Sequence, residues 1–358
     1  MTHQLTRDEA RRIIVRAQLL DADRPSDVVE VAEQLGQIKI DPTNTIAPAE
    51  HSILFSRIGP GYEAHQLTQA VEHDRTLFEH IGMFVPVSLL PLMLPVMREV
   101  PLHEKRRAWL DANSSFKKDV LARLRADGPL LASEIPDTAA VAAKDDSWYG
   151  PSQVPRMLET LQLMGEIGVV GRESRAKRWD VAERAFASNL PEYDLETAQR
   201  MLNESRLQAL GLVKQKWAHT PVGDAGEPAT VDGSRWTWRV DPQALAALDD
   251  DPGGRVAFLN PYDGLLFDRP RLSELFEFDY VLEQFKKKHE RKYGFFSYPI
   301  LMGDRFVGML EAEVDRKREL LVVAAVHEFL PFEAEEDEMV RAEIADLADW
   351  LGVGLPAW

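Results

Sequence analysis

Three amphipathic helices followed by a hairpin, in the middle of the chain, constrain the fold more than any other feature of this sequence. Residues 116–126 and 151–165 each place apolar side chains on one helical face, and a short helix is predicted between them at 130–135. Residues 167–170 and 179–181 predict two antiparallel strands joined by a turn. Helices followed by such a hairpin are typical of a winged helix, in which the hairpin forms the wing.

The turn of this hairpin is basic and carries a single acid. Four of its side chains are cations: Arg172, Arg175, Lys177 and Arg178. Because much of a protein's affinity for DNA comes from neutralising phosphates, we predict that these four side chains contact DNA. The alternative is a surface turn that is merely solvated by its charges.

The pattern of the whole chain predicts an α+β protein with tandem winged-helix units followed by a C-terminal antiparallel sheet or barrel. Short alternating segments after residue 255 and the tight turn at Gly303-Asp304 indicate the sheet. The expected domains are an N-terminal winged-helix-like domain with the candidate active site at 1–112, a second winged helix at 113–190, a reduced third winged helix or helical linker at 191–250, and a β-rich domain with an acidic terminal helix at 251–358.

Local signals define several helix ends. Thr6 and Glu9 predict a capping box for a helix at 5–20, and Gly36 is expected to end a second helix at 27–35. Farther along, a loop is predicted at 219–234 and a strand at 234–240.

Charge is unevenly distributed along this acidic chain, whose formal net charge is −17. A negative net charge repels the phosphates of nucleic acids, so it argues at first against a nucleic-acid partner. However, acids dominate residues 330–358, whereas a second basic cluster lies at 286–292. A basic face therefore remains compatible with the net charge of −17. We predict DNA contacts by this cluster, which contains Lys286, Lys287, Lys288, Arg291 and Lys292.

Composition excludes several other classes of protein. There are no cysteines, which excludes disulfides and thiolate metal sites, and the nine histidines show no metal-binding spacing. We therefore expect neither a metal nor a cofactor. The N-terminus lacks an apolar signal core and three prolines interrupt the apolar run at 81–97, so we expect a cytoplasmic protein without membrane contact.

The candidate active site follows a short strand near the N-terminus. Residues 38–41 alternate between apolar and charged side chains and stop at Pro42, so a cation and a carboxylate leave the strand on the same face. Further polar groups follow within a few turns. The convergent set is Lys39, Asp41, Asn44, His51 and Arg57.

Several stretches resemble the winged-helix DNA glycosylases of the AlkZ/YcaQ type. The most specific is Leu259-Asn260-Pro261-Tyr262-Asp263-Gly264-Leu265-Leu266-Phe267-Asp268-Arg269, and the hairpin at 165–179 is also similar. The family's catalytic motif is Gln, an apolar residue, then Asp or Gln, and Lys39-Ile40-Asp41 stands at that position. Three positions depart from the family pattern: Lys39, Pro48 and Glu50.

The resemblance implies which residues act. Asp41, Asn44, His51 and Arg57 fall on matching positions, and His80 with Pro86 resembles a later family segment. Asp41 is then expected to stabilise the oxocarbenium-like sugar and hold the attacking water, with Asn44 or His51 orienting it. Lys39 is expected to keep Asp41 ionised, and the alternative is that Lys39 itself attacks C1′ as an amine. The expected DNA contacts outside the two basic clusters are Arg57, His80 and Arg269.

The expected function is excision of alkylated or crosslinked purines, of the N7-alkylguanine type, from double-stranded DNA. We expect a monomer that has no protein partner and is associated with the nucleoid in the cytoplasm. One alternative is a non-catalytic winged-helix DNA-binding protein, such as a lesion sensor or a transcriptional regulator. Another is an acidic scaffold without a nucleic-acid partner.

Overall fold

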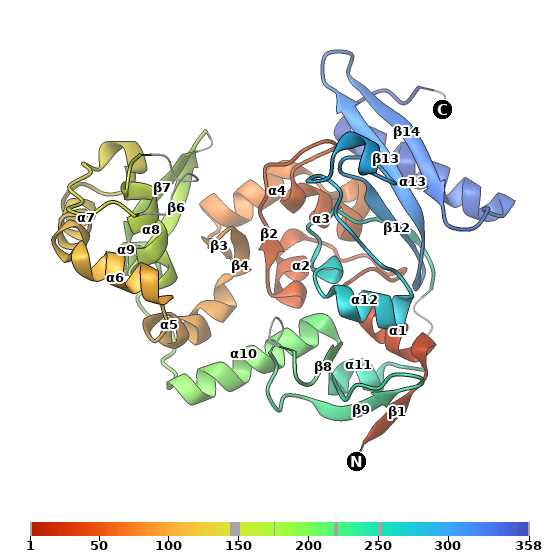
Figure 1. Cartoon of the computed structure of the whole chain (residues 1–358), viewed down its shortest axis with the longest axis horizontal. Helices are drawn as coiled ribbons and strands as arrows, with labels where there is room; N and C mark the ends of the chain where they lie inside the picture. Colours follow the sequence, from red (N-terminus) through yellow and green to blue (C-terminus); the bar gives the residue numbers. More distant parts are fainter. Residues whose placement is uncertain (1, 144–150, 175, 218–220, 250–252, 357–358) are drawn as a thin grey trace. The chain divides into compact units, whose positions relative to one another are not determined.

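The computed structural model describes residues 2–143, 151–174, 176–217, 221–249 and 253–356, in two compact units. The first unit combines Met1–Leu67 with Asn203–Trp358, and the second is Thr68–Leu202. Both contain helices and antiparallel strand pairs (Figure 1), so the mixed α+β class is confirmed.

The first unit begins with helices whose ends the local sequence determines. Helix α1 (Arg7–Ala17) starts with the predicted capping box, in which Thr6 and Glu9 bond each other's backbone N–H groups. Helix α2 (Val28–Leu35) ends at Gly36, which adopts the left-handed conformation that glycine tolerates best. The remaining elements before residue 68 are β2 (Ile38–Lys39), α3 (Ala49–Ile58), a 3₁₀ turn (Gly59–Gly61) and α4 (Ala64–Thr68), whose last residue already belongs to the second unit.

A four-stranded sheet joins the N-terminus to the middle of the chain. Its order is β1 (His3–Leu5), β9 (Glu227–Val231), β10 (Trp238–Val240) and β8 (Leu212–Lys214). Strands β1 and β9 run parallel, with Gln4 opposite Thr230. The prediction of a loop throughout 219–234 is therefore wrong at β9. Its partner strand lies more than 200 residues away, and no local pattern reveals such a pairing. Two helices flank these strands: α10 (Leu195–Leu210) and α11 (Pro242–Ala246).

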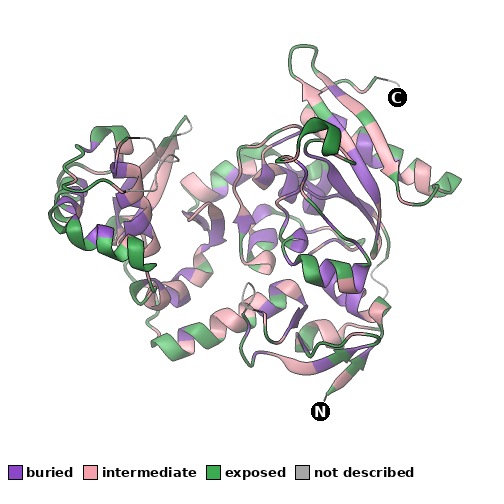
Figure 2. Cartoon of the chain, in the orientation of Figure 1, coloured by how far each residue is buried: buried purple, intermediate pink, exposed green. Residues whose placement is uncertain are grey.

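The C-terminal sheet agrees with the prediction. Its strands follow the order β11 (Val256–Phe258), β12 (Tyr298–Met302), β13 (Arg305–Asp315) and β14 (Leu320–Glu328), and all adjacent pairs are antiparallel. Figure 2 shows that β12 is buried, whereas much of β14 is only partly so. The other elements of this region are a 3₁₀ turn (Gly264–Leu266), α12 (Arg269–Phe276), a second 3₁₀ turn (Lys288–Glu290) and the acidic helix α13 (Ala334–Leu351).

One hydrophobic core connects three of the predicted domains. Leu5 and Ile14 from the N-terminal segment, Trp238 from the middle and Leu301 from the C-terminal sheet belong to the same buried cluster. The segments 1–67, 203–250 and 251–358 thus bury apolar surface against one another, which is why they fold as one unit.

The second unit contains the helices and hairpin predicted between residues 116 and 181. Helices α7 (Ser114–Asp127) and α8 (Val154–Leu163) and strands β6 (Ile167–Glu173) and β7 (Ala176–Val181) confirm the predicted segments. The short helix predicted at 130–135 is instead a strand, β5 (Leu130–Leu131), followed by a 3₁₀ turn (Ala132–Glu134). Leu130 pairs with Trp179 of β7, and this pairing overrides the local helical preference.

The remainder of the second unit is built around an apolar, proline-interrupted run. It comprises a π-helix (Gln69–His73), β3 (Leu77–His80), β4 (Met83–Pro86), a 3₁₀ turn (Val87–Leu89), α5 (Leu90–Arg98), α6 (Glu104–Ala112) and α9 (Ala182–Ala185). Among the helices that the structure describes, none is both long and apolar enough to cross a membrane.

Candidate active site

The candidate active site is the segment between β2 and the end of α3, in the first unit. Ile38 is fully buried and anchors β2, whereas Lys39 and Asp41 are only partly buried. The regular strand ends at Lys39, two residues earlier than predicted. Asp41 therefore lies on the connecting loop, where its orientation depends on local hydrogen bonds.

Three hydrogen bonds fix the backbone and carboxylate of Asp41. The carboxylate oxygen Oδ1 accepts a bond from the Thr43 backbone N–H at 2.9 Å. The Asp41 backbone N–H donates to Oε2 of Glu50 at 3.2 Å, and its carbonyl accepts from the Ala49 N–H at 3.1 Å. Glu50, one of the three departures from the family pattern, therefore helps to position Asp41.

Partly buried His51 and fully buried Tyr62 form a pair beside this loop. The His51 Nδ1 atom lies 2.6 Å from the Tyr62 hydroxyl oxygen, and Tyr62 is fully buried. Burial lowers the pKa of His51, and burial together with the nearby charge of Glu50 raises the pKa of Tyr62. A neutral imidazole and a protonated phenol therefore share this hydrogen bond at neutral pH. Tyr62 was not singled out in the sequence, because an isolated tyrosine after a glycine turn carries no motif.

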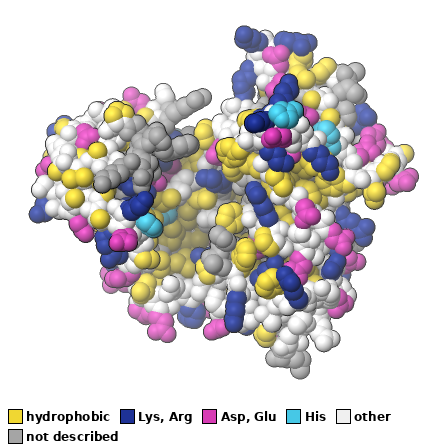
Figure 3. Space-filling model, in the orientation of Figure 1, with side chains coloured by type: hydrophobic (Ala, Val, Ile, Leu, Met, Phe, Trp, Pro, Cys, Tyr) yellow, Lys and Arg dark blue, Asp and Glu magenta, His cyan; other side chains and the backbone are white. Residues whose placement is uncertain are grey.

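The turn of the β13–β14 hairpin approaches the candidate active site from a distant part of the chain. Arg316 donates from Nη2 to the carbonyl oxygen of Asn44 at 3.2 Å, and the Val314 N–H donates to the Thr45 carbonyl at 2.8 Å. Three consecutive exposed cations occupy this turn: Arg316, Lys317 and Arg318. Figure 3 shows that Lys and Arg side chains gather at the tip of the hairpin. They were not predicted as site residues, although they form a basic run in the sequence.

Arg57 does not have the predicted role in DNA contact. Its side chain is 0% exposed and pairs with the equally buried Asp263, with Nη2 to Oδ1 at 3.0 Å and a second bond from Nη1 to Oδ2. Its Nε donates to the Gln18 carbonyl at 3.1 Å. Because no part of this guanidinium reaches the surface, Arg57 instead fixes α3 to the 259–269 segment.

The wing cations of the second unit are largely engaged in ion pairs. Arg172 and Lys177 each lie 2.6 Å from the buried carboxylate of Glu79, and Arg178 pairs with Glu173. Their side chains keep about a third of their surface exposed. Arg175 lies outside the described residues.

His80, also in the second unit, is a neutral side chain. Burial lowers its pKa from 6.5 to about 4, so the imidazole carries no charge at neutral pH. Its predicted contact with DNA could then involve hydrogen bonding but no attraction of a cation for phosphate.

The pKa of His80 predicts a pH dependence of stability. Below pH 6.5 the unfolded chain binds a proton at His80 that the folded chain does not, so folding stability falls as pH decreases towards about 4. Relative to His80→Gln, the wild type should lose about 1 to 2 kcal/mol between about pH 7 and pH 5, as measured by urea unfolding at each pH. The same substitution at the exposed His289 is the matched control. Equal pH profiles for the wild type and His80→Gln would contradict the prediction.

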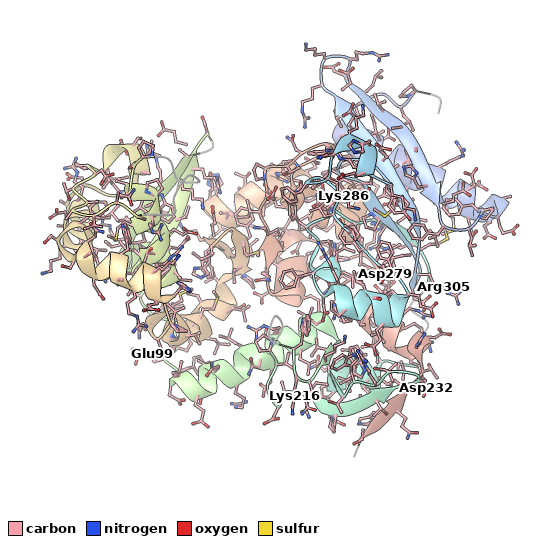
Figure 4. The ribbon with its side chains drawn as sticks, in the orientation of Figure 1. Glu99, Lys216, Asp232, Asp279, Lys286 and Arg305 are labelled. Carbon is pink, nitrogen blue, oxygen red and sulfur yellow. The ribbon has the colours of Figure 1, made fainter. Side chains whose placement is uncertain are left out.

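The second basic cluster lies on the loop between α12 and β12, where Figure 4 labels Lys286. Lys287, Lys288 and Lys292 are exposed, whereas Lys286 and Arg291 are partly buried. Arg269 is exposed, and its guanidinium carbon lies 5.7 Å from the centre of the Tyr280 ring. Among the described residues there is no group of three or more carboxylate or imidazole side chains that could hold a metal ion.

The comparisons with known proteins agree with this architecture. A family model for AlkZ-like DNA glycosylases matches residues 32–350, so the chain belongs to this family, as the sequence resemblance predicted. This membership places it among the DNA glycosylases and supports a role in DNA repair. The DNA glycosylase AlkZ of Streptomyces sahachiroi has a similar fold, with a TM-score of 0.64 and 16% sequence identity over 99% of both chains.

Proposed function

We propose that this protein hydrolyses the N-glycosidic bond of alkylated or crosslinked purines of the N7-alkylguanine type in double-stranded DNA. The observation that carries the proposal is the fixed carboxylate of Asp41, on a loop that the cationic turn of β13–β14 also contacts. A positioned carboxylate beside cations suits a reaction in which positive charge develops on a sugar held by its phosphates.

The chemistry requires little acid catalysis. Guanine alkylated at N7 is already a cation, so it leaves as a neutral base without prior protonation. The task of the protein is to stabilise the oxocarbenium-like sugar and to hold a water molecule against C1′, and a carboxylate can do both. Asp41 has this role in our proposal. Neutral His51, held by Tyr62, orients the water, and Asn44 positions the sugar.

DNA binding in this proposal uses several cationic surfaces. Arg316, Lys317 and Arg318 contact the phosphates next to the lesion, while the loop at 286–292 and Arg269 contact the backbone farther away. The helices and hairpin at 113–190 act as a winged helix in a tandem arrangement, with the exposed parts of the wing cations directed at phosphates. The protein binds as a monomer.

Lys39 offers the alternative nucleophile. If its amine attacked C1′, the product would be a Schiff base with the opened sugar, which borohydride reduces to a stable protein–DNA adduct. Attack by water leaves no covalent bond between protein and DNA. We therefore expect the wild type treated with borohydride to give no more protein–DNA adduct than Lys39→Ala gives. An adduct that forms with the wild type and disappears in Lys39→Ala would show that Lys39, rather than water, attacks the sugar.

A panel of duplexes tests the proposed function. The wild type should release free base from DNA containing N7-methylguanine or an N7-linked crosslink, and none from undamaged DNA, as followed by mass spectrometry. Salt-dependent binding without release from any duplex would favour the non-catalytic DNA-binding protein.

A further inference from the structure

The loop between α12 and β12 is held in one shape by a buried carboxylate. Glu283 accepts hydrogen bonds from the backbone N–H groups of Lys292 and Tyr293, both at 2.8 Å, and pairs with the Lys286 ammonium at 2.8 Å. Burial opposes ionisation of Glu283, yet these hydrogen bonds keep its pKa below the ordinary range. The Arg291 Nε also donates to the Lys286 carbonyl at 3.0 Å. The loop is thus closed on itself around Glu283.

Phe285 projects from this closed loop into solvent. Its side chain is 87% exposed, more than any other large hydrophobic residue in the described part of the chain, including Leu330 at 78% and Phe267 at 65%. Exposing an aromatic side chain forgoes about 2 kcal/mol of burial energy. Because single exposed apolar side chains are common on protein surfaces, what Phe285 binds has to be argued from the charges around it.

The charges around Phe285 define what it can bind. Lys286, Lys287 and Lys288 follow directly, whereas Leu330, the other highly exposed apolar residue, is followed by the acidic residues that begin α13. Proteins that bend or open DNA combine phosphate-binding cations with an apolar wedge that enters the stack of bases. We propose that Phe285 is such a wedge and that it inserts between base pairs next to the lesion while Lys287 and Lys288 bind the flanking phosphates.

Hydrogen bonds connect the wedge loop to the candidate active site within the first unit. Gln284, next to Phe285, donates to the Tyr262 hydroxyl at 2.7 Å, and the Tyr262 N–H donates to Asn260 at 2.9 Å. Asn260 donates to the Tyr298 hydroxyl at 3.1 Å, and this hydroxyl lies 3.2 Å from Ser52 Oγ, next to His51 on α3. This connection holds the wedge in a fixed relation to α3. The inference rests on the proposed function, since it names how that site would gain access to a stacked base.

The test measures unstacking separately from base release. Full-length wild type, Phe285→Ala and Phe285→Trp are titrated with a duplex that carries N7-methylguanine next to 2-aminopurine, whose fluorescence rises when it unstacks. Leu330→Ala is the matched control, because it removes another highly exposed apolar side chain, in acidic surroundings. Anisotropy gives the affinity, and thermal unfolding verifies that each variant is folded.

We expect the fluorescence rise with the wild type, Phe285→Trp and Leu330→Ala, and its loss in Phe285→Ala, which should bind about tenfold to a hundredfold more weakly. For the double variant Lys287→Gln/Lys288→Gln, the slope of log binding constant against log salt concentration should be smaller in magnitude by about two. At saturation this variant should still produce the fluorescence rise. An unchanged rise in folded Phe285→Ala would overturn the wedge even if base release is observed. Conversely, Phe285-dependent unstacking without release of any base would support the wedge and contradict the proposed function.

Discussion

The substitution Asp41→Asn is expected to abolish nearly all base release while leaving DNA binding intact. The asparagine side-chain oxygen can still accept the hydrogen bond from the Thr43 N–H, so the turn should keep its shape. The negative charge that stabilises the sugar and activates water is lost, which should lower the single-turnover rate by about 10²- to 10⁴-fold. Rapid-quench measurement of free base, with protein in excess over DNA, gives this rate.

A matched control separates this effect from a general loss of charge. Glu63→Asn removes a carboxylate from an exposed position shortly after α3. In the described part of the structure, the charged partner of Glu63 is His65. We expect this variant to release base at the wild-type rate. If Asp41→Asn also retained that rate, another group would have to perform the chemistry.

The second large effect is expected on stability, from the buried pair of Arg57 and Asp263. Replacing Arg57 by Met leaves the Asp263 carboxylate buried without its partner, which should cost about 3 to 5 kcal/mol of unfolding free energy. Urea unfolding followed by circular dichroism measures the change. The double variant Arg57→Met/Asp263→Leu should recover much of the loss, because it removes both charges from the core.

An exposed ion pair on α13 provides the comparison. Arg341 lies 2.8 Å from Asp337 with both side chains about half exposed, so Arg341→Ala should cost less than about 1 kcal/mol. If Arg57→Met were as mild as Arg341→Ala, Arg57 would not have the structural role that its burial indicates.

Features encoded in neighbouring residues could be predicted from the sequence. The capping box of Thr6 and Glu9, the end of α2 at Gly36 and the hairpin turn at Gly303-Asp304 each depend on residues a few positions apart. Family resemblance added the candidate role of Asp41, although the structure places this residue on the loop after β2 and not on the predicted strand.

Features that depend on distant partners could not be predicted. Arg57 was assigned to DNA because nothing near it in sequence indicates Asp263, 206 residues away. Arg316 was missed for the same reason, since Asn44 lies 272 residues before it. Residues 227–231 form strand β9 because they pair with β1 and β10. In each case a tertiary contact between residues far apart in the chain decided the outcome, and local sequence patterns do not reveal such contacts.

The most direct test of the central claim is the appearance of free 7-methylguanine from a damaged duplex in one turnover. The account predicts that wild-type protein in excess releases the base well above the spontaneous rate, leaves an abasic strand, and does so only when residue 41 is a carboxylate. Release no faster than in buffer, from duplex that is demonstrably bound, would contradict it.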